Sequence, residues 1–278
     1  MKDKIITFLK GLFIGGTMTV PGVSGGSMAM ILGIYNRLIS SIATFRKNVK
    51  KNIVFLLFFV AGGLIGVLIF SKYIITPLME NFPLATGYFF LGAVAGGVPI
   101  ILKTAKVKKI SPRIIAFPIL GMFPILLIDL IPSGLFSPGE GFTFSGVVVQ
   151  IFGGIFVAAA LVLPGISVSQ VLLMMGIYDK ILVAMGNFDF ETLLYFAPLV
   201  LGIIVGILGV AKFMNMAMEK FPQKTYLTVF GFLLASVPDL ILKVGVPGGI
   251  YIPICILAAA LGFSFIFLLQ KLEEKINY

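Results

Sequence analysis

The sequence at residues 20–24, VPGVS, recurs 143 residues later at residues 163–167 as LPGIS. At the same offset, residues 33–37, GIYNR, recur at residues 176–180 as GIYDK. The two matches run in the same order along the chain, and self-similarity at a fixed offset is the sequence signature of an internal repeat. The chain is therefore predicted to consist of two related halves.

The composition is that of an integral membrane protein. Of the 278 residues, 59% are hydrophobic and 12% are charged, and the mean hydropathy is +1.12. A soluble domain carries about 25% charged residues, so this chain has too little polar surface to cover a water-soluble core. The sequence has no His and only one Cys, which excludes His proton shuttles, thiolate zinc sites and disulfides. We expect no catalytic residue, no metal and no cofactor, and the absence of a Walker motif argues against ATP as the energy source.

Ten apolar runs approach the ~20 residues that a helix needs to cross a bilayer. They lack the alternation of a membrane β-barrel, so all are predicted to be helices. The runs cover about residues 5–20, 26–45, 53–71, 85–102, 113–131, 145–163, 169–186, 193–214, 226–242 and 250–270.

Each half then contains five runs. Because this number is odd, the second half must lie upside down relative to the first, as in the inverted-topology repeats of many secondary transporters. The predicted fold is an all-α membrane domain of two inverted repeats, residues 1–140 and 141–278. Each repeat is a hairpin followed by three transmembrane helices: the hairpins cover about 5–45 and 145–186, and the helices about 53–131 and 193–270.

The basic residues predict the orientation. With a cytoplasmic N-terminus, only Lys72, Lys180 and Lys243 of the 21 basic residues lie outside. The positive-inside rule therefore places both termini in the cytoplasm. The same rule accounts for the net charge of +10, so we expect no nucleic-acid partner.

The turns of the two hairpins are uncharged. Residues 11–36 and 141–178 contain no Asp, Glu, Lys or Arg, whereas a turn in water usually carries some. Irregular backbone within a membrane is tolerated only inside protein or along a wet cavity. Both hairpins are therefore predicted to be re-entrant, with their tips near the membrane midplane.

Small polar residues at the tips predict an anion site. Pro and Gly end the first helix, a Ser caps the next, and the free amides of a helix start attract an anion such as phosphate. The alternative interpretation is that these small residues only allow helices to approach closely. The predicted phosphate-binding residues are Pro21, Gly22, Ser24, Gly25, Gly26, Ser27, Pro164, Gly165, Ser167, Ser169 and Gln170.

Arg37 and Lys180 each follow the Ser of their hairpin by 13 residues, which is ~20 Å of helix rise. We expect them near opposite membrane surfaces, where they attract an anionic headgroup as it enters; ordinary snorkelling is the alternative. Of the scarce carboxylates, Asp129 and Asp239 are candidates to carry a proton, although Lys243, four residues after Asp239, favours a local ion pair.

The two Pro-Gly-x-Ser elements, with residues 25–35 and 176–178, resemble the bacterial polyprenyl-phosphate (undecaprenyl-phosphate) transporters, a family once catalogued as a domain of unknown function. The resemblance covers nearly the whole chain. It implies a flippase in the bacterial cytoplasmic membrane that returns undecaprenyl phosphate from the outer to the inner leaflet, for reuse in envelope polymer synthesis. This chain has Val168 where the family often has Gly, so the two tips need not be equivalent.

Two other functions share these features. Undecaprenyl-pyrophosphate phosphatases also use a Pro-Gly-x-Ser element, but theirs continues with Arg, where this chain has Gly25 and Val168. A transporter of a small soluble anion would use the same tip chemistry. The partners expected are a polyprenyl-phosphate lipid, membrane lipids and a coupling ion, which the sequence leaves open between proton and sodium.

Overall fold

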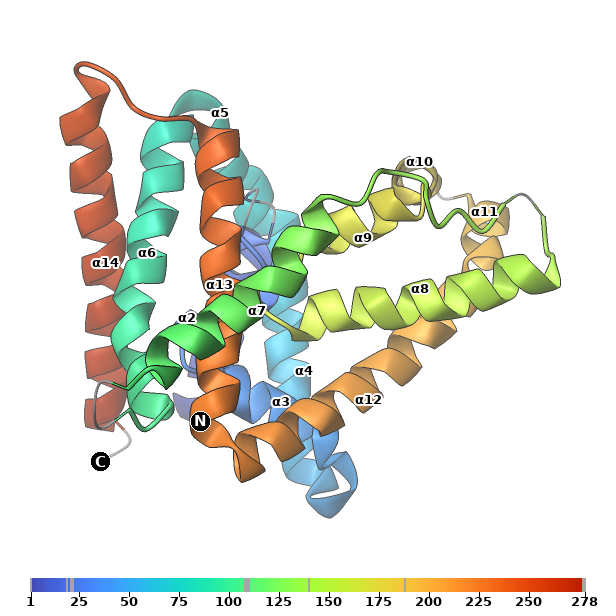
Figure 1. Ribbon diagram of the computed structural model, residues 1–278, viewed down its shortest axis with the longest axis horizontal. Helices are drawn as coiled ribbons and strands as arrows, with labels where there is room; N and C mark the ends of the chain where they lie inside the picture. The colour runs from blue at the N-terminus through green and yellow to red at the C-terminus, as the bar shows by residue number, and fades with distance from the viewer. Residues whose placement is uncertain are drawn as a thin grey trace.

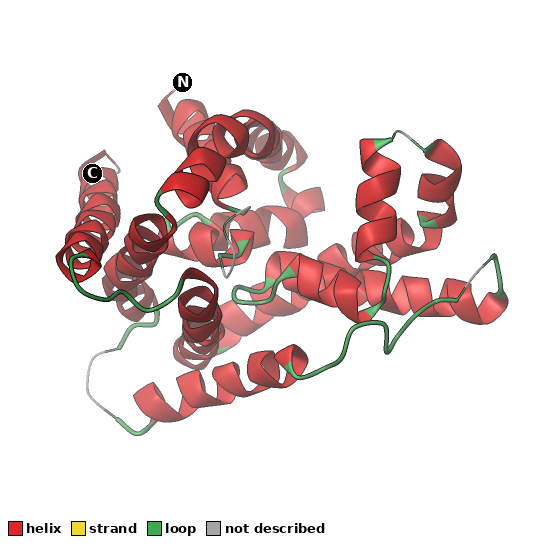
Figure 2. Ribbon diagram, turned by 90° about the horizontal axis from the view of Figure 1, so that it is seen from above, coloured by secondary structure: helices red, strands yellow, loops and turns green. Residues whose placement is uncertain are grey.

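The computed structural model describes residues 2–18, 20, 23–107, 111–139, 141–187 and 189–276. Within these ranges every regular element is a helix, as Figure 2 shows. The first half contains α1 (Lys2–Thr17), α2 (Gly25–Ile31), α3 (Tyr35–Ala43), η1 (Phe45–Lys47), α4 (Val49–Ile65), η2 (Gly66–Ile75), α5 (Thr76–Asn81), α6 (Pro83–Thr104) and α7 (Arg113–Asp129). The second contains α8 (Phe144–Val162), α9 (Val168–Met174), α10 (Tyr178–Gly186), α11 (Phe190–Tyr195), α12 (Ala197–Lys220), α13 (Pro222–Val244) and α14 (Tyr251–Ile276).

Six of the described helices are long and apolar enough to cross a membrane: Val49–Asn81, Pro83–Thr104, Phe144–Val162, Ala197–Lys220, Pro222–Val244 and Tyr251–Lys271. The chain is therefore a multi-pass, all-helical membrane protein. Five of these helices overlap runs predicted to span. The sixth, α8, was expected only as a hairpin arm, while the predicted span at residues 113–131 forms the shorter helix α7.

Two of the predicted runs are each divided into two short helices. Gly33 separates α2 from α3, and Gly176 separates α9 from α10, with φ angles of +68° and +64°. In each turn the amide after the glycine bonds to the carbonyl five residues before it, at 3.0 and 3.1 Å. This left-handed end is a Schellman motif, for which glycine has no steric penalty. The expectation of one continuous helix in each run was wrong for this reason.

The two halves share a set of helix pairs. In the first half α1 lies against α4, and in the second α8 lies against α12; α6 pairs with α14, and α13 with α7. In Figure 1, α6, α13 and α14 stand side by side, while α8 and α12 project together to one side. In all four pairs a glycine of each helix lies against the partner's backbone, which permits close approach: Gly15 and Gly63, Gly154 and Gly202, Gly92 and Gly262, and Gly121 and Gly231.

Candidate functional site

The two Pro-Gly-x-Ser turns meet in the interior. The amide of Gly165 donates to Ser24 Oγ at 3.0 Å and to Ser27 Oγ at 3.1 Å. The buried Gly26 lies so close to the second turn that an added Cβ would be 3.0 Å from the backbone nitrogen of Pro164. Residues about 140 positions apart in sequence thus form one junction.

At the first turn, Ser24 is the N-cap of α2. Its Oγ accepts from the amide of Ser27 at 3.1 Å and lies 2.8 Å from Ser27 Oγ, so the predicted cap is confirmed. Two hydroxyls bring two protons, and only one can lie between the two oxygens. The other is free to donate to a ligand, as are the amides of Gly25 and Gly26, which have no hydrogen-bond partner in the described part of the chain.

The second turn is built differently. Ser167 stands at the N-cap position of α9, but its side chain makes no capping bond; its Oγ lies 2.7 Å from Ser169 Oγ instead. The predicted cap by Ser167 is therefore wrong: its hydroxyl meets the hydroxyl of Ser169 and no amide of α9. Pro164 is buried, and Ser167, Ser169 and Gln170 are half-buried. This hydroxyl pair also has one proton to spare.

Gly165 sits in the left-handed region with a φ of +84°, and a Cβ there would collide with the backbone carbonyl of Phe232 in α13. The second turn is thereby fixed between the first turn and α13. Pro21 and Gly22 lie outside the described residues. Because α2 and α9 have only seven residues each, their dipoles are small, and the polar character of the junction comes from hydroxyls and amides.

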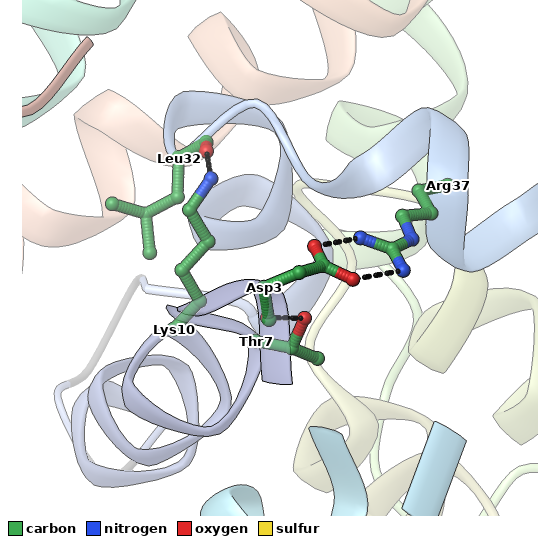
Figure 3. Close-up of polar contacts among 5 residues, drawn as sticks. All are labelled: Asp3, Thr7, Lys10, Leu32 and Arg37. Atoms are coloured by element: carbon green, nitrogen blue, oxygen red, sulfur yellow. Dashed lines mark hydrogen bonds and ion pairs between the residues drawn. The ribbon is translucent and has the colours of Figure 1, made fainter. Parts of the chain in front are cut away.

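The far end of α2 is held by two side chains that the sequence did not single out. Lys10 Nζ donates to the carbonyl of Leu32 at 2.6 Å, and Gln270 Nε2 donates to the carbonyl of Ile31 at 3.0 Å. Figure 3 shows the Lys10 amine reaching this carbonyl from α1. These donors satisfy carbonyls that a helix end leaves free. No sequence signal joins them to α2, because their separations of 22 and 239 residues are set by the tertiary fold.

An apolar groove of about 460 Å³ reaches this junction. Leu163 and Phe232, which flank Gly165, line the groove, and Lys224 lies in the first turn of α13. From Lys224 to Phe232 the groove follows α13 for about 12 Å. Its lining comes from α8, the residue that follows it, α12, α13 and the turn between the last two: Ala159, Leu163, Val210, Phe213, Met214, Ala217, Phe221, Lys224, Thr225, Thr228, Val229 and Phe232.

The charged candidates lie elsewhere. Arg37, on α3, forms an ion pair with Asp3, and Lys180 is exposed on α10. In Figure 1, α3 lies low in the view and α10 high. Asp239 and Lys243 form the expected local ion pair at 2.8 Å; the side chain of Asp129 lies outside the described residues.

The chain resembles known proteins over most of its length. The family model described as undecaprenyl phosphate translocase-like (VCA0040-like) matches residues 14–244. A Vibrio cholerae serotype O1 protein named polyprenyl-phosphate transporter is 29% identical over 248 residues, which cover 84% of this chain and 76% of that protein. A Staphylococcus aureus protein of the same name is 30% identical over 240 residues, covering 84% of each chain. No solved structure matches significantly.

Proposed function

The chain belongs to the undecaprenyl phosphate translocase-like family, and from this premise we propose that it moves undecaprenyl phosphate from the outer to the inner leaflet of the bacterial cytoplasmic membrane. The returned lipid would re-enter the synthesis of envelope polymers. The observation that carries the proposal is the junction of two serine turns beside an apolar groove. One lipid phosphate needs both features: polar groups for its head and an apolar path for its chain.

The proposed architecture is a pair of inverted repeats, residues 1–140 and 141–278, with re-entrant hairpins meeting at the junction. Several matched features support it. The helices after the turns have equal lengths in the two halves, seven residues in α2 and α9 and nine in α3 and α10. The pairs α1–α4 and α8–α12 correspond under the repeat, as do α6–α14 and α13–α7. Rocking of one half against the other would then expose the junction to each side in turn.

In the proposed site, the phosphate lies at the junction. The spare hydroxyl protons of the pairs Ser24–Ser27 and Ser167–Ser169 would donate to its oxygens, together with the amides of Gly25 and Gly26. A charge in the bilayer interior is costly, so these donors would lower the barrier to crossing. Arg37 and Lys180 would attract the headgroup at the two surfaces, and both termini would be cytoplasmic.

The groove favours a lipid substrate over a small soluble anion. Its volume of about 460 Å³ falls in the range of about 300–1,000 Å³ that is typical of small-molecule sites. A small soluble anion would gain no binding energy from a lining dominated by Leu, Val, Phe and Met side chains. The chain would lie along α13 while the phosphate rests at the junction.

The proposal is tested with the double variant Ser24→Ala, Ser167→Ala in proteoliposomes that contain undecaprenyl phosphate. Each substitution removes one hydroxyl of its pair and with it the placement of the remaining donor, and a misplaced bond to a charged ligand costs about 1.5–3 kcal/mol. Transport per folded molecule should therefore fall at least tenfold. Because Ser24 also caps α2 and accepts from the Gly165 amide, the amount of folded protein is measured for every variant and transport is expressed relative to it. Ser145→Ala, an exposed serine at the start of α8, is the control. Wild-type transport by the double variant would refute the proposed phosphate site.

The competing function is a phosphatase acting on the pyrophosphate form of the lipid. Incubation of the purified protein with undecaprenyl pyrophosphate separates the two functions, since a transporter releases no phosphate.

In cells, leaflet-resolved detection of undecaprenyl phosphate tests the proposed direction of transport. More of this lipid should be found on the outer surface when the protein is removed.

A further inference from the structure

Arg37 is held in a fixed orientation by two neighbours. Its Nη1 and Nη2 donate to Asp3 Oδ1 and Oδ2 at 2.6 and 2.8 Å, and its guanidinium carbon is 4.3 Å from the centre of the Phe55 ring. Figure 3 shows the carboxylate facing the guanidinium fork, with Thr7 bonded to the Asp3 backbone at 2.8 Å. The ring and the carboxylate together orient a bidentate donor.

Two adjoining cavities surround this ion pair. They have volumes of about 520 and 430 Å³, and both are lined by Asp3, Arg37 and Lys51. Lys4 and Lys50 also line the larger one. The lining thus has four basic side chains against one carboxylate, so a surplus of positive charge remains after Asp3 is paired.

The chemistry of the fork suits a phosphate as well as a carboxylate. Arg binds both bidentately through two parallel hydrogen bonds. The Asp3 side chain is 67% exposed and that of Arg37 is 38% exposed, and an ion pair so open to water is weak. Asp3 carries one negative charge, whereas a phosphate monoester carries up to two, and the surrounding lysines favour the more negative group.

We propose that the two adjoining cavities around Arg37, called the Arg37 cavity below, bind a phosphate monoester. In the absence of the ligand the Asp3 carboxylate pairs with the Arg37 guanidinium as an internal competitor, and the ligand displaces it. The identification of the ligand as a polyprenyl phosphate rests on the proposed function, but the phosphate chemistry does not. Displacement of Asp3 would release the first turn of α1 from α3. Because α1 also carries Lys10, which holds the end of α2, movement of α1 would also shift α2, the helix that Ser24 caps and that contains Ser27.

The test is phosphate binding by the purified full-length protein in detergent, with inorganic phosphate and farnesyl phosphate as separate probes. Asp3→Asn removes the competing charge at constant size, so binding should tighten about two- to fivefold. Arg37→Gln should weaken binding at least about tenfold, and Arg37→Lys, which keeps the charge without the fork, should also weaken it. Asp239→Asn breaks the ion pair with Lys243 on α13 and should leave binding unchanged.

The two probes distinguish the sources of the phosphate. Tightening with both shows that the cavity recognises the phosphate group alone, whereas tightening only with farnesyl phosphate shows that the chain contributes. Weaker or unchanged binding of both probes by folded Asp3→Asn protein would overturn the proposal, since Asp3 would then be only structural. Failure of lipid transport would leave this binding pattern intact, so the two proposals fail separately.

Discussion

At the scale of single residues, Gly165 is the most constrained position of the junction. It combines a φ of +84° with a backbone carbonyl where a Cβ would lie. Ala at positive φ costs about 1–2 kcal/mol, and overpacking adds about 1–3 kcal/mol. Gly165→Ala should therefore lower the melting temperature in detergent and abolish transport.

Gly139 supplies the matched control, because its φ is +80° and an added Cβ would have open space around it. Gly139→Ala should show the conformational cost alone. Equal loss of stability in the two variants would mean that contact between Gly165 and α13 contributes nothing to stability, which would contradict close packing of the second turn against α13.

At the scale of helices, the groove between α8, α12 and α13 makes a prediction about chain length. Ala217 lines it from α12 and is half-buried, so Ala217→Phe should fill part of the space. Transport of undecaprenyl phosphate should fall several-fold, while a short-chain phosphate such as geranyl phosphate is less affected. Met216 is exposed on the same helix and does not line the groove, so Met216→Phe is the control. An equal fall in transport of the long-chain and the short-chain phosphate would show that the lipid chain does not lie in this groove during transport.

The helices also show what could be predicted from the sequence. Apolar run length placed most spanning helices, and the repeated Pro-Gly-x-Ser elements indicated the two turns that meet, because both signals are local. The breaks at Gly33 and Gly176 were missed, since glycine is common within membrane helices and its φ is not visible in a pattern. The pairing of Asp3 with Arg37 was missed because their meeting depends on how α1 lies against its neighbours.

The cap at Ser167 shows a different limit. Its position before α9 matches that of Ser24 before α2, and the sequence pattern therefore predicted equal caps. Ser24 has Ser27 three residues later, whereas Ser167 has Ser169 two residues later. The Ser24 hydroxyl meets both the hydroxyl and the amide of Ser27, whereas the Ser167 hydroxyl meets only the hydroxyl of Ser169. Repeated motifs predicted the same turn but not the same hydrogen bonds.

At the scale of the whole molecule, the proposed inverted repeat makes a prediction about sidedness. Residues 33–37 and 176–180 match in sequence, yet the proposed inversion would place α3 and α10 on opposite faces of the membrane. The single cysteine, Cys255, is buried, so a Cys255→Ser background allows labelling at chosen exposed positions. We choose Lys47, just after α3, and Asp179 on α10, both exposed.

In intact cells a membrane-impermeant maleimide should label Asp179→Cys and should reach Lys47→Cys only after the membrane is permeabilised. The physical reason is the distribution of charge: Lys47 belongs to a basic segment with Arg46, Lys50 and Lys51, which the positive-inside rule retains in the cytoplasm. Labelling of both positions from one side would exclude inversion, and alternating access by two opposed halves would lose its structural basis. Labelling from opposite sides, but with Lys47 outside, would keep the inverted repeat and reverse the orientation, so that the Arg37 cavity would receive the lipid instead of releasing it.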